Sequence, residues 1–419
     1  MKKFRLGDIA NVVLSGIDKK TKEGESAIRL CNFTDVYYNW AITNNMYNDL
    51  MLASASDSDI ETFSLKKGQV AITKDSETRD DIGVATYIAD DFDDVVLGYH
   101  CALITPRTDV PEEEKIYGKY LNALLHTKYA QKYFSNNATG SGQRYTLSKE
   151  AIEDMPVYLP SYKEQVRIGD YLSDIDKKIE IINLINAELE AMSKQIYDYW
   201  FVQFDFPDKE GKPYKSSGGK MVWNETLKRE IPEGWSDGVL KDIANITMGQ
   251  SPDGSSYNED GVGTIFYQGC TDFGVRFPKV RKYTTSPSRL AKKCDILMSV
   301  RAPVGTTNIA NSDCCIGRGL AALNSSIGSI THLYQTIKDL KAKFDIINNG
   351  GTTFGAINKD ELHSLIVTIP DETVLGKFEE IAEPIFEKQM ELGFEIEELQ
   401  SLRDLLLPLL INGQVIIKD

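Results

Sequence analysis

Hydrophobic residues recur at steps of three and four along two long stretches of the chain, residues 161–203 and 371–412. Such steps place side chains along one face of a helix, and two faces of this kind pack together in a coiled coil. We therefore predict two long helices that pair. The first stripe is Leu172, Ile175, Ile179, Ile182, Ile185, Leu189, Met192, Ile196 and Tyr199. The second stripe is Ile381, Ile385, Leu392, Ile396, Leu399, Leu402, Leu406 and Leu409.

Two prolines interrupt the second stretch. Proline lacks the backbone N–H that an interior helical residue donates, and its ring clashes with the preceding turn. Pro384 therefore predicts a kink or a late start of the second helix, and Pro408 predicts that the helix bends or ends there.

The segment before each predicted helix has a different pattern, in which short hydrophobic runs alternate with turns. Runs of this length predict strands. Each segment also has one helical stretch, near residues 115–133 and 329–346, which precedes a glycine-rich loop. The predicted strands are Val70–Thr73, Val95–Leu97, Ala102–Thr105, Ile296–Val300, Leu320–Leu323 and Ile366–Ile369. The predicted fold class is mixed α/β (α+β).

The two globular segments also repeat each other in sequence. FRLGDIANVVLSG (4–16) resembles GVLKDIANITMGQ (238–250), and LSKEAIEDMPVYLPS (147–161) aligns without a gap with INKDELHSLIVTIPD (357–371). The chain therefore consists of two copies of one plan. The predicted boundaries are 1–160 for the first globular domain, 161–203 for its helix, 204–234 for a linker, 235–370 for the second globular domain and 371–412 for the second helix.

Charge is distributed unevenly along the chain. The formal net charge of −15 disfavours binding to nucleic acid by the chain as a whole. Residues 235–370 nevertheless carry 14 basic and 12 acidic side chains, and the stretch from Arg276 to Arg301 has eight basic residues against the single acid Asp295. Residues 371–419 carry 4 basic and 12 acidic side chains. A phosphate-facing surface is thus predicted locally in the second copy, and the acidity is concentrated at the C-terminus.

The chain lacks the sequence patterns of common enzyme classes. The six cysteines form no C-x-x-C pair, the four histidines form no H-E-x-x-H pair, and there is no G-x-x-x-x-G-K-[ST] loop, G-x-S-x-G elbow or Asp/Asn-Pro-Pro-aromatic tetrad. We therefore predict a protein that is not an enzyme and holds no cofactor itself. No apolar run approaches the ~20 residues of a membrane helix, so we expect a cytoplasmic protein with no membrane partner.

Loops at equivalent places in the two copies carry different side chains. Small residues in TGSGQRYTLS (139–148) and GGTTFGAIN (350–358) allow close backbone approach, and the turns SVRAPVG (299–305) and IGRGL (316–320) each present an arginine. Glutamine can read adenine and arginine can read guanine through paired hydrogen bonds. One scaffold with two loop chemistries suits two readers of DNA; the alternative is that these glycines only close turns. The candidate DNA-contacting residues are Lys74, Arg79, Gln143, Arg144, Tyr145, Arg276, Lys279, Arg281, Lys282, Arg301, Arg318, Thr352, Thr353 and Phe354.

Together these features resemble the specificity (S) subunit of type I restriction–modification systems. The similarity spans essentially the whole chain. It rests on the strand-to-helix junctions MPVYLPSYKEQ (155–165) and LIVTIPDETV (365–374), on REIPEGWSDGVLKDIANITMGQSP (229–252), and on the helix exit YDYWFVQFDFP (197–207). The first copy departs from the family pattern where SGID (15–18) replaces the GQSP of the second copy.

The resemblance implies two target recognition domains and two long helices that pair as an antiparallel coiled coil. It implies a bipartite, asymmetric target in double-stranded DNA, with a spacer set by the helices. It also implies two methyltransferase (M) subunits that bring S-adenosylmethionine, and motor–nuclease (R) subunits that use ATP and Mg²⁺, in a bacterial or archaeal cytoplasm. Three alternatives stay open: a related system whose partner fuses methyltransferase and nuclease, a stand-alone DNA-binding regulator, and a coiled-coil scaffold.

Overall fold

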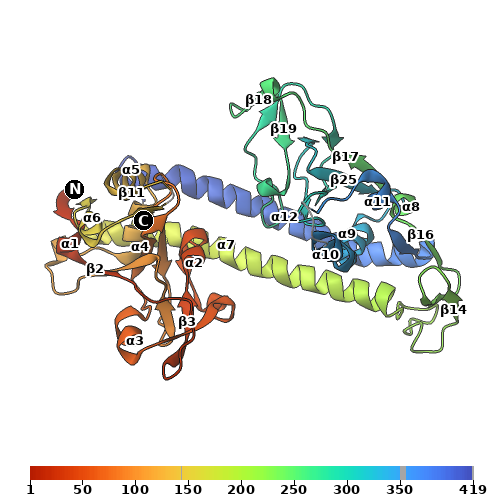
Figure 1. The fold of residues 1–419 in the computed structure, drawn as a ribbon, viewed down its shortest axis with the longest axis horizontal. Helices are drawn as coiled ribbons and strands as arrows, with labels where there is room; N and C mark the ends of the chain where they lie inside the picture. Colours follow the sequence, from red (N-terminus) through yellow and green to blue (C-terminus); the bar gives the residue numbers. More distant parts are fainter. Residues whose placement is uncertain (143, 350–354, 418–419) are drawn as a thin grey trace. The chain divides into compact units, whose positions relative to one another are not determined.

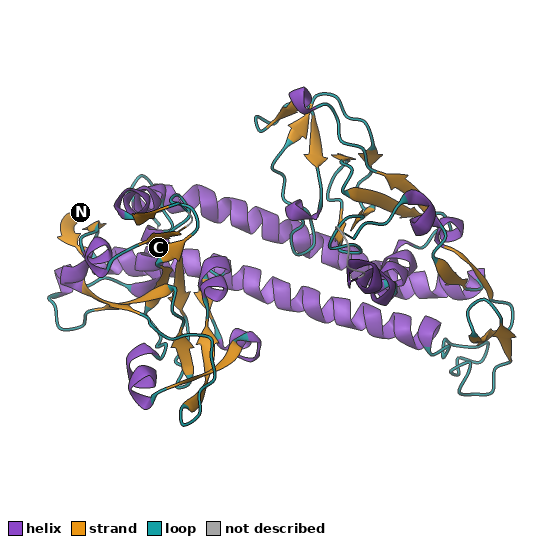
Figure 2. Ribbon diagram, in the orientation of Figure 1, coloured by secondary structure: helices purple, strands orange, loops and turns teal. Residues whose placement is uncertain are grey.

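The computed structural model describes residues 1–142, 144–349 and 355–417 of the chain (Figure 1). The chain divides into two compact units, one formed by Met1–Ile181 with the C-terminal residues from Glu397 onward, and the other by Ile182–Ile396. Each unit contains a globular α/β part and portions of two long helices, α7 (Tyr162–Tyr197) and α12 (Glu372–Ile411) (Figure 2). The predicted mixed α/β class with two long helices is confirmed, whereas the predicted domain boundaries remain a prediction.

The globular part of the first unit is built on a five-stranded sheet with the strand order β2-β10-β6-β8-β4. Beside it lie a sheet of order β5-β3-β9, a sheet of order β11-β12-β7 and the pair β1–β13. The strands are β1 (Lys2–Arg5), β2 (Ala10–Leu14), β3 (Ser26–Cys31), β4 (Ala41–Ile42), β5 (Met51–Ala55), β6 (Val70–Thr73), β7 (Asp75–Ser76), β8 (Ala85–Ile88), β9 (Val95–Leu97), β10 (Cys101–Pro106), β11 (Thr139–Ser141), β12 (Arg144–Thr146) and β13 (Pro156–Leu159). The α-helices are α1 (Leu6–Ile9), α2 (Phe33–Tyr38), α3 (Asp57–Phe63), α4 (Gly118–Leu125), α5 (Lys128–Asn137) and α6 (Lys149–Glu153).

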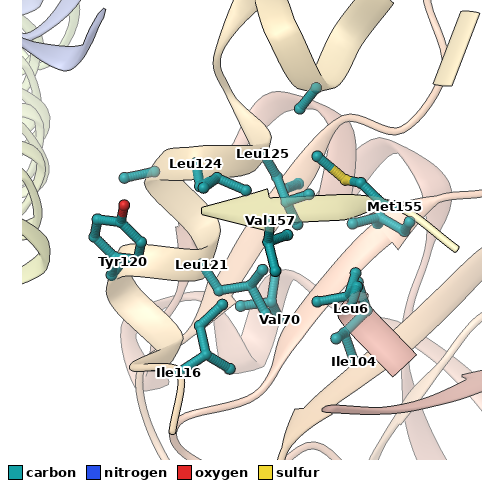
Figure 3. Close-up of a cluster of buried hydrophobic side chains, with 14 of the residues drawn as sticks. Leu6, Val70, Ile104, Ile116, Tyr120, Leu121, Leu124, Leu125, Met155 and Val157 are labelled. Atoms are coloured by element: carbon teal, nitrogen blue, oxygen red, sulfur yellow. The ribbon is translucent and has the colours of Figure 1, made fainter. Parts of the chain in front are cut away.

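The core of this domain lies where α4 packs on the central sheet. Every residue of β6 and β8 is buried. Neither strand therefore shows the alternation of hydrophobic and polar residues that is typical of a strand with one face in solvent. The side chains of α4 meet those of the sheet and of β13 in one cluster (Figure 3). Members of the cluster include Leu6, Val70, Ile104, Ile116, Tyr120, Leu121, Leu124, Leu125, Met155 and Val157.

The globular part of the second unit is also built from β-sheets and short helices, but its strand orders differ from those of the first. One sheet has the order β17-β25-β22-β23, another has the order β18-β20-β19-β24-β21, and β16 pairs with β26. The strands are β16 (Ser236–Val239), β17 (Ala244–Met248), β18 (Tyr257–Asn258), β19 (Thr264–Tyr267), β20 (Tyr283–Thr284), β21 (Leu290–Ala291), β22 (Ile296–Ser299), β23 (Thr307–Ile309), β24 (Cys314–Ile316), β25 (Leu320–Ser325) and β26 (Ile366–Ile369). The α-helices are α8 (Leu240–Ile243), α9 (Ile330–Asp339), α10 (Lys341–Asn349) and α11 (Lys359–His363).

The repeated opening of the two copies has the same structural role in each unit. Leu6 and Leu240 are fully buried at the first position of α1 and α8. The backbone N–H of Leu6 donates to the carbonyl of Met155 at 2.9 Å, and that of Leu240 donates to the carbonyl of Leu365 at 2.8 Å. In each copy the repeat therefore joins the start of the domain to the strand that leads into a long helix.

The long helices run antiparallel. In the second unit, Gln389 of α12 donates to the backbone carbonyl of Asn186 in α7 at 3.3 Å. Farther along α7, Phe201 in the π-helical turn Asp198–Val202 packs edge-to-face on Phe378, with ring centroids 4.9 Å apart. Residue numbers thus fall along α12 as they rise along α7, which confirms the expected antiparallel coiled coil.

Helix α12 passes through both prolines. It begins at Glu372, so a late start at Pro384 is wrong, whereas the alternative of a kink there stays a prediction. The neighbouring side chains of Ile385 and Phe386 are buried, and this packing outweighs the missing backbone donor. The helix ends at Ile411, three residues after Pro408, so Pro408 does not end it directly. Gly413, just beyond the end, has a positive φ of 67°, a backbone conformation that favours glycine.

The segment between α7 and the second domain is folded onto the second unit. It contains the hairpin of β14 (Met221–Asn224) and β15 (Arg229–Pro232). Its aromatic residues pack with those of the α7 exit; the cluster includes Trp200, Phe201, Phe204, Phe206 and Trp235. Among the described residues, no helix combines the length and the apolar character that a membrane crossing requires.

Candidate nucleic-acid interface

Three segments of the first domain converge on Asp75. Strand β6 leads through Lys74 into β7, the turn after β9 carries His100, and β12 begins at Arg144. The backbone N–H of Lys74 donates to the carbonyl of His100 at 2.8 Å, and β12 pairs with β7 so that Thr146 lies opposite Asp75. The fold therefore brings together polar side chains that lie up to 70 positions apart in sequence.

The carboxylate of Asp75 binds three basic side chains, which together form the Asp75 cluster (Lys74, Asp75, His100 and Arg144). Its Oδ2 accepts a hydrogen bond from Lys74 Nζ at 2.9 Å and lies 2.9 Å from His100 Nδ1 and 3.6 Å from Arg144 Nη2. Burial raises the pKa of Asp75, but hydrogen bonds from Thr146, His100 and Lys74 outweigh it and leave the pKa below its ordinary value. An ionised carboxylate only accepts, so His100 directs Nδ1–H to it and keeps Nε2 as an acceptor in the neutral ring.

An open pocket of about 520 Å³ lies beside the Asp75 cluster. His100 and Arg144 line it on one side, and the aromatic side chains Phe33, Tyr37 and Tyr38 of α2 also line it. Hydrogen-bonding groups next to aromatic surfaces are the means by which proteins recognise nucleobases. The pocket is the candidate recognition site of the first domain.

One predicted DNA-contacting residue of the β11–β12 hairpin, Arg144, lines this pocket, and Tyr145 follows it in β12. The Arg144 side chain is 59% exposed. Arg79 is exposed; its guanidinium lies 5.6 Å from the ring centroid of Tyr145 and donates to the carbonyl of Ala138 at 3.2 Å. Gln143 lies outside the described residues. The structure thus places Arg79, from the segment after β7, against Tyr145 of the hairpin that also carries Arg144.

Lys74 has a different position from the one expected for a DNA-contacting lysine. It is buried, and its ammonium group lies between the Asp75 carboxylate and the Tyr99 ring, whose centroid is 4.7 Å away. Lys74 therefore holds the carboxylate from inside the domain, while its contact with DNA stays a prediction.

The second domain presents a different polar group, the Gln268 cluster (Ser251, Gln268 and Arg318). Gln268 Nε2 donates to Ser251 Oγ at 2.9 Å, and the backbone N–H of Arg318 donates to the same hydroxyl at 3.4 Å. The close approach of these loops requires glycine, because a Cβ on Gly249 would lie 2.2 Å from the carbonyl oxygen of Gly317. Arg318 is exposed and Gln268 is half-buried. An amide and a guanidinium are the side-chain groups that read adenine and guanine.

Basic residues of the stretch after Arg276 are mostly at the surface. Lys279 and Lys282 are exposed. Arg281 is also exposed but pairs with Asp272, to which its Nε donates at 2.7 Å. The two lysines therefore have the placement expected of phosphate contacts, whereas Arg281 is partly engaged within the domain.

Of the remaining predicted contacts in the second copy, Arg301 is described and lies at the surface. Its backbone forms an isolated antiparallel bridge with Ala356, which holds the turn against the end of the glycine-rich loop. Thr352, Thr353 and Phe354 lie outside the described residues.

Arg276 is placed inside the second unit rather than on a DNA-facing surface. Its side chain is only 10% exposed, and its guanidinium lies 3.6 Å from the carboxylate of Glu190 in α7 and 4.9 Å from the ring centroid of Phe386 in α12. Lys338 also pairs with Glu190, and Gln389 Nε2 donates to it at 3.1 Å. The Glu190 carboxylate thus ties the second domain to both helices, and the Arg276 cation is used in this network.

Sequence reasoning missed several residues of the two clusters. The sequence carried a signal for Ser251, which lies in the GQSP turn, and for His100, which lies in the short turn after Gly98, directly before β10. Asp75, Tyr99 and Gln268 lie in segments without a distinctive pattern. Only the fold shows that their side chains belong to the site.

Comparison with known proteins agrees with these features. The family described as "Type I restriction modification DNA specificity domain" matches residues 1–191 and again residues 232–383. Two matches in one chain correspond to the two copies predicted from the sequence repeat. A solved structure of the type I restriction–modification S subunit from M. genitalium matches with a TM-score of 0.56 and covers 98% of this chain and 95% of that one; at 15% identity it supports the fold.

Two curated relatives give the same result. The putative type I restriction enzyme MjaX specificity subunit of Methanocaldococcus jannaschii is 31% identical over 319 residues, which cover 74% of this chain and 70% of the relative. The type I restriction enzyme HindI specificity subunit of Haemophilus influenzae is 22% identical over 417 residues, which cover 84% and 87% of the two chains. Both relatives are specificity subunits, whose role in DNA recognition is non-catalytic. The family match over both copies and these relatives show that the chain belongs to the type I restriction–modification DNA specificity family, as a specificity subunit.

Proposed function

We propose that this specificity subunit reads a bipartite, asymmetric site in double-stranded DNA, with one half-site for each globular domain. The observation that carries the proposal is that two copies of one fold present different polar groups. The first copy has the Asp75 cluster, and the second has the Gln268 cluster. Different hydrogen-bonding groups on equivalent scaffolds suit two half-sites of different base sequence.

Two kinds of side chain contact DNA in this proposal. Lys279 and Lys282 neutralise phosphates, which contributes affinity that depends on salt and not on sequence. Arg144, Arg301 and Arg318 read base edges, since all three are exposed arginines on loops or strand ends of the two domains.

The long helices bind the partner subunits in this proposal. Both expose large hydrophobic side chains, among them Leu184 and Ile185 of α7 and Leu405 of α12, which is 62% exposed. Scattered apolar residues are ordinary on a surface, but rows of them along a helix favour a protein partner. The acidic segment 371–419 repels phosphate and so suits the same use. The partners are two methyltransferase subunits, which supply S-adenosylmethionine, and motor–nuclease subunits, which use ATP and Mg²⁺.

Single-molecule sequencing of DNA tests the proposal directly. The DNA comes from cells that express this chain with the methyltransferase encoded beside it, and the control cells lack only this chain. We expect N6-methyladenine at one split motif that requires the chain. A stable complex that adds no methylation would overturn the proposal.

The nature of the partner is tested separately. Native mass spectrometry of the complex purified through this chain measures the mass of each associated subunit. Separate methyltransferase and motor–nuclease subunits are expected. A single large subunit that carries both activities would instead assign the chain to the related system with a fused partner.

A further inference from the structure

The Asp75 cluster has an anchored half and an exposed half. The Asp75 side chain is only 8% exposed and Lys74 is buried with it, whereas His100 is 40% and Arg144 is 59% exposed. The side chains of His100 and Arg144 reach the surface, while the buried Asp75 carboxylate that they contact is held within the domain. This division resembles that of a binding site, in which buried groups hold the groups that contact the ligand.

Tyr99 fixes the exposed pair from a second direction. Its ring centroid lies 5.9 Å from the guanidinium carbon of Arg144 and 4.7 Å from the ring centroid of His100, which it meets edge-on. Arg144 and His100 therefore share both the carboxylate and the aromatic ring. Side chains that are ordered before binding lose less entropy when a ligand binds, which favours selective recognition.

The hydrogen-bonding groups of this pair match one base pair in particular. Arg144 presents the two-pronged donor of a guanidinium. In its neutral form, His100 presents Nε2 as an acceptor, because its Nδ1–H points to Asp75. In the major groove a G·C pair shows two acceptors on guanine, N7 and O6, next to one donor on cytosine, N4. An A·T pair shows one donor, which lies between two acceptors. The two adjacent donors of Arg144 and the single acceptor of His100 therefore fit an A·T pair less well than a G·C pair.

The charges around the pocket disfavour a phosphate as the ligand. Glu77 and Asp81 line the same pocket as His100 and Arg144, and the hydroxyl of Tyr37 holds Asp81 in place with a hydrogen bond of 2.8 Å. Carboxylates repel phosphate oxygens but accept hydrogen bonds from the amino groups of bases. A base edge is therefore the better ligand for this pocket.

We propose that Arg144 and His100 read one G·C base pair of the first half-site and that Asp75 is their positioning residue. The inference rests on the proposed function and adds to it the base pair and the reading residues. Arg144 pairs with guanine, and His100 accepts from the cytosine amino group. Asp75 touches neither base and acts through the orientation of both side chains.

The test measures the methylated motif of variants of the full chain, each expressed with its methyltransferase. We expect the wild-type motif to contain a G·C pair that Arg144→Ala and His100→Ala both relax, at the same position. The loss of discrimination there should be about tenfold to a hundredfold. Asp75→Asn keeps the shape of the side chain but removes its charge, and it should relax the same position.

Two further variants serve as controls. Arg107→Ala removes an arginine that pairs with Asp109 through two hydrogen bonds away from the pocket, and it should leave the motif unchanged. Arg318→Ala should relax a position in the other half-site. An unchanged second half-site in the Asp75→Asn variant shows that the protein is folded, so relaxation of the first is a positioning effect.

Several outcomes would overturn the inference. One is a first half-site without a G·C pair at the affected position. Another is an even loss of methylation at all sites in Arg144→Ala with no change of motif, which would assign that arginine to a phosphate. An absence of any wild-type motif would overturn the proposed function itself, and is distinct from both.

Discussion

The guanidinium of Arg403 lies over the indole ring of Trp40, 4.8 Å from the ring centroid. Trp40 also stacks on buried His126, with ring centroids 4.3 Å apart, and Arg403 lies 3.6 Å from the carboxylate of Asp176. Trp40 and His126 belong to the first globular domain, Asp176 to α7 and Arg403 to α12. In the first unit a single side chain therefore ties the domain to both helices, as Glu190 does in the second unit.

Replacing Arg403 should destabilise the first unit. Arg403→Gln removes the contact with the Trp40 ring and leaves the largely buried Asp176 without its cation. We expect a loss of about 2 kcal/mol in the free energy of unfolding. Urea unfolding followed by hydrogen exchange of peptides from the first domain measures it. Arg107→Gln is the matched control, because its pair with Asp109 is at the surface and should contribute less than about 1 kcal/mol. Equal losses in both variants would contradict the assignment.

The buried histidines predict a loss of stability in mild acid. Burial lowers the pKa of His332 to about 3, and burial together with the Arg403 charge lowers that of His126 to about 4. The unfolded chain binds these protons first, near an ordinary histidine pKa of about 6.5. Stability is therefore present above pH 6.5 and falls as the pH drops toward the folded-state values. Each histidine should contribute a loss of about 2 kcal/mol between pH 7 and pH 5.

His332 is the better probe of this effect. In the first unit burial raises the pKa of Asp176 to about 6, although the Arg403 charge lowers it. The folded state then binds this proton more tightly than the unfolded chain, so acidification stabilises that unit through Asp176 and offsets His126. His332→Gln should flatten the dependence of unfolding free energy on pH in the second unit. An identical pH dependence in the variant and the wild type would contradict the prediction.

The Glu190 network predicts a specific weakness in the second unit. Glu190→Gln leaves Lys338 and the nearly buried Arg276 without their shared carboxylate. We expect the unfolding free energy to fall by about 1–3 kcal/mol, with faster hydrogen exchange in α9 and in the adjoining part of α7. Glu188→Gln is the control, since Glu188 is an exposed residue of the same helix. Unchanged exchange in the Glu190 variant would mean that aromatic packing alone holds the domain on the helices.

The sequence predicts local features of this fold well. All six predicted strands are strands, because short hydrophobic runs between turns depend on neighbouring residues only. The predicted helical stretch near 115–133 divides into α4 and α5, since Thr127 caps a new helix by accepting a hydrogen bond from the Ala130 N–H. A late start at Pro384 is wrong because tertiary packing of α12 outweighs the local effect of proline on the helix.

The candidate sites were less predictable than the fold. Arg276 has the same sequence signal as Lys279, a basic residue in a basic stretch, yet one side chain is nearly buried and the other is exposed. Asp75 lies in a segment without a distinctive sequence pattern, but pairing of β7 with β12 places it beside His100 and Arg144. Which charged residue reads a ligand depends on contacts between distant segments, and periodicity carries no information about these.

The exposed hydrophobic residues of α12 predict where a partner binds. Leu405→Asp places a charge on a side chain that is now exposed and apolar. Association with the methyltransferase should weaken by tenfold or more, because the charge must be desolvated in the interface, while the stability of the chain alone stays unchanged. Sedimentation of the mixed subunits measures the association. Ser401→Asp adds the same charge at another exposed position of the helix and serves as the control. Equal association of both variants with the partner would place the interface elsewhere.

Salt dependence separates phosphate contacts from base contacts. Lys279→Ala should weaken binding to all duplexes by the same factor and reduce the slope of log affinity against log salt by about 1, because one phosphate contact is lost. Arg301→Ala should instead relax one position of the second half-site by about 1–3 kcal/mol. The assay compares a duplex carrying the methylated motif with duplexes changed at single positions, at several salt concentrations. Lys388→Ala is the control, since Lys388 lies in α12 and pairs with Glu391. Uniform weakening by Arg301→Ala would assign Arg301 to a phosphate, and the base readers of the second domain would then be sought in the Gln268 cluster.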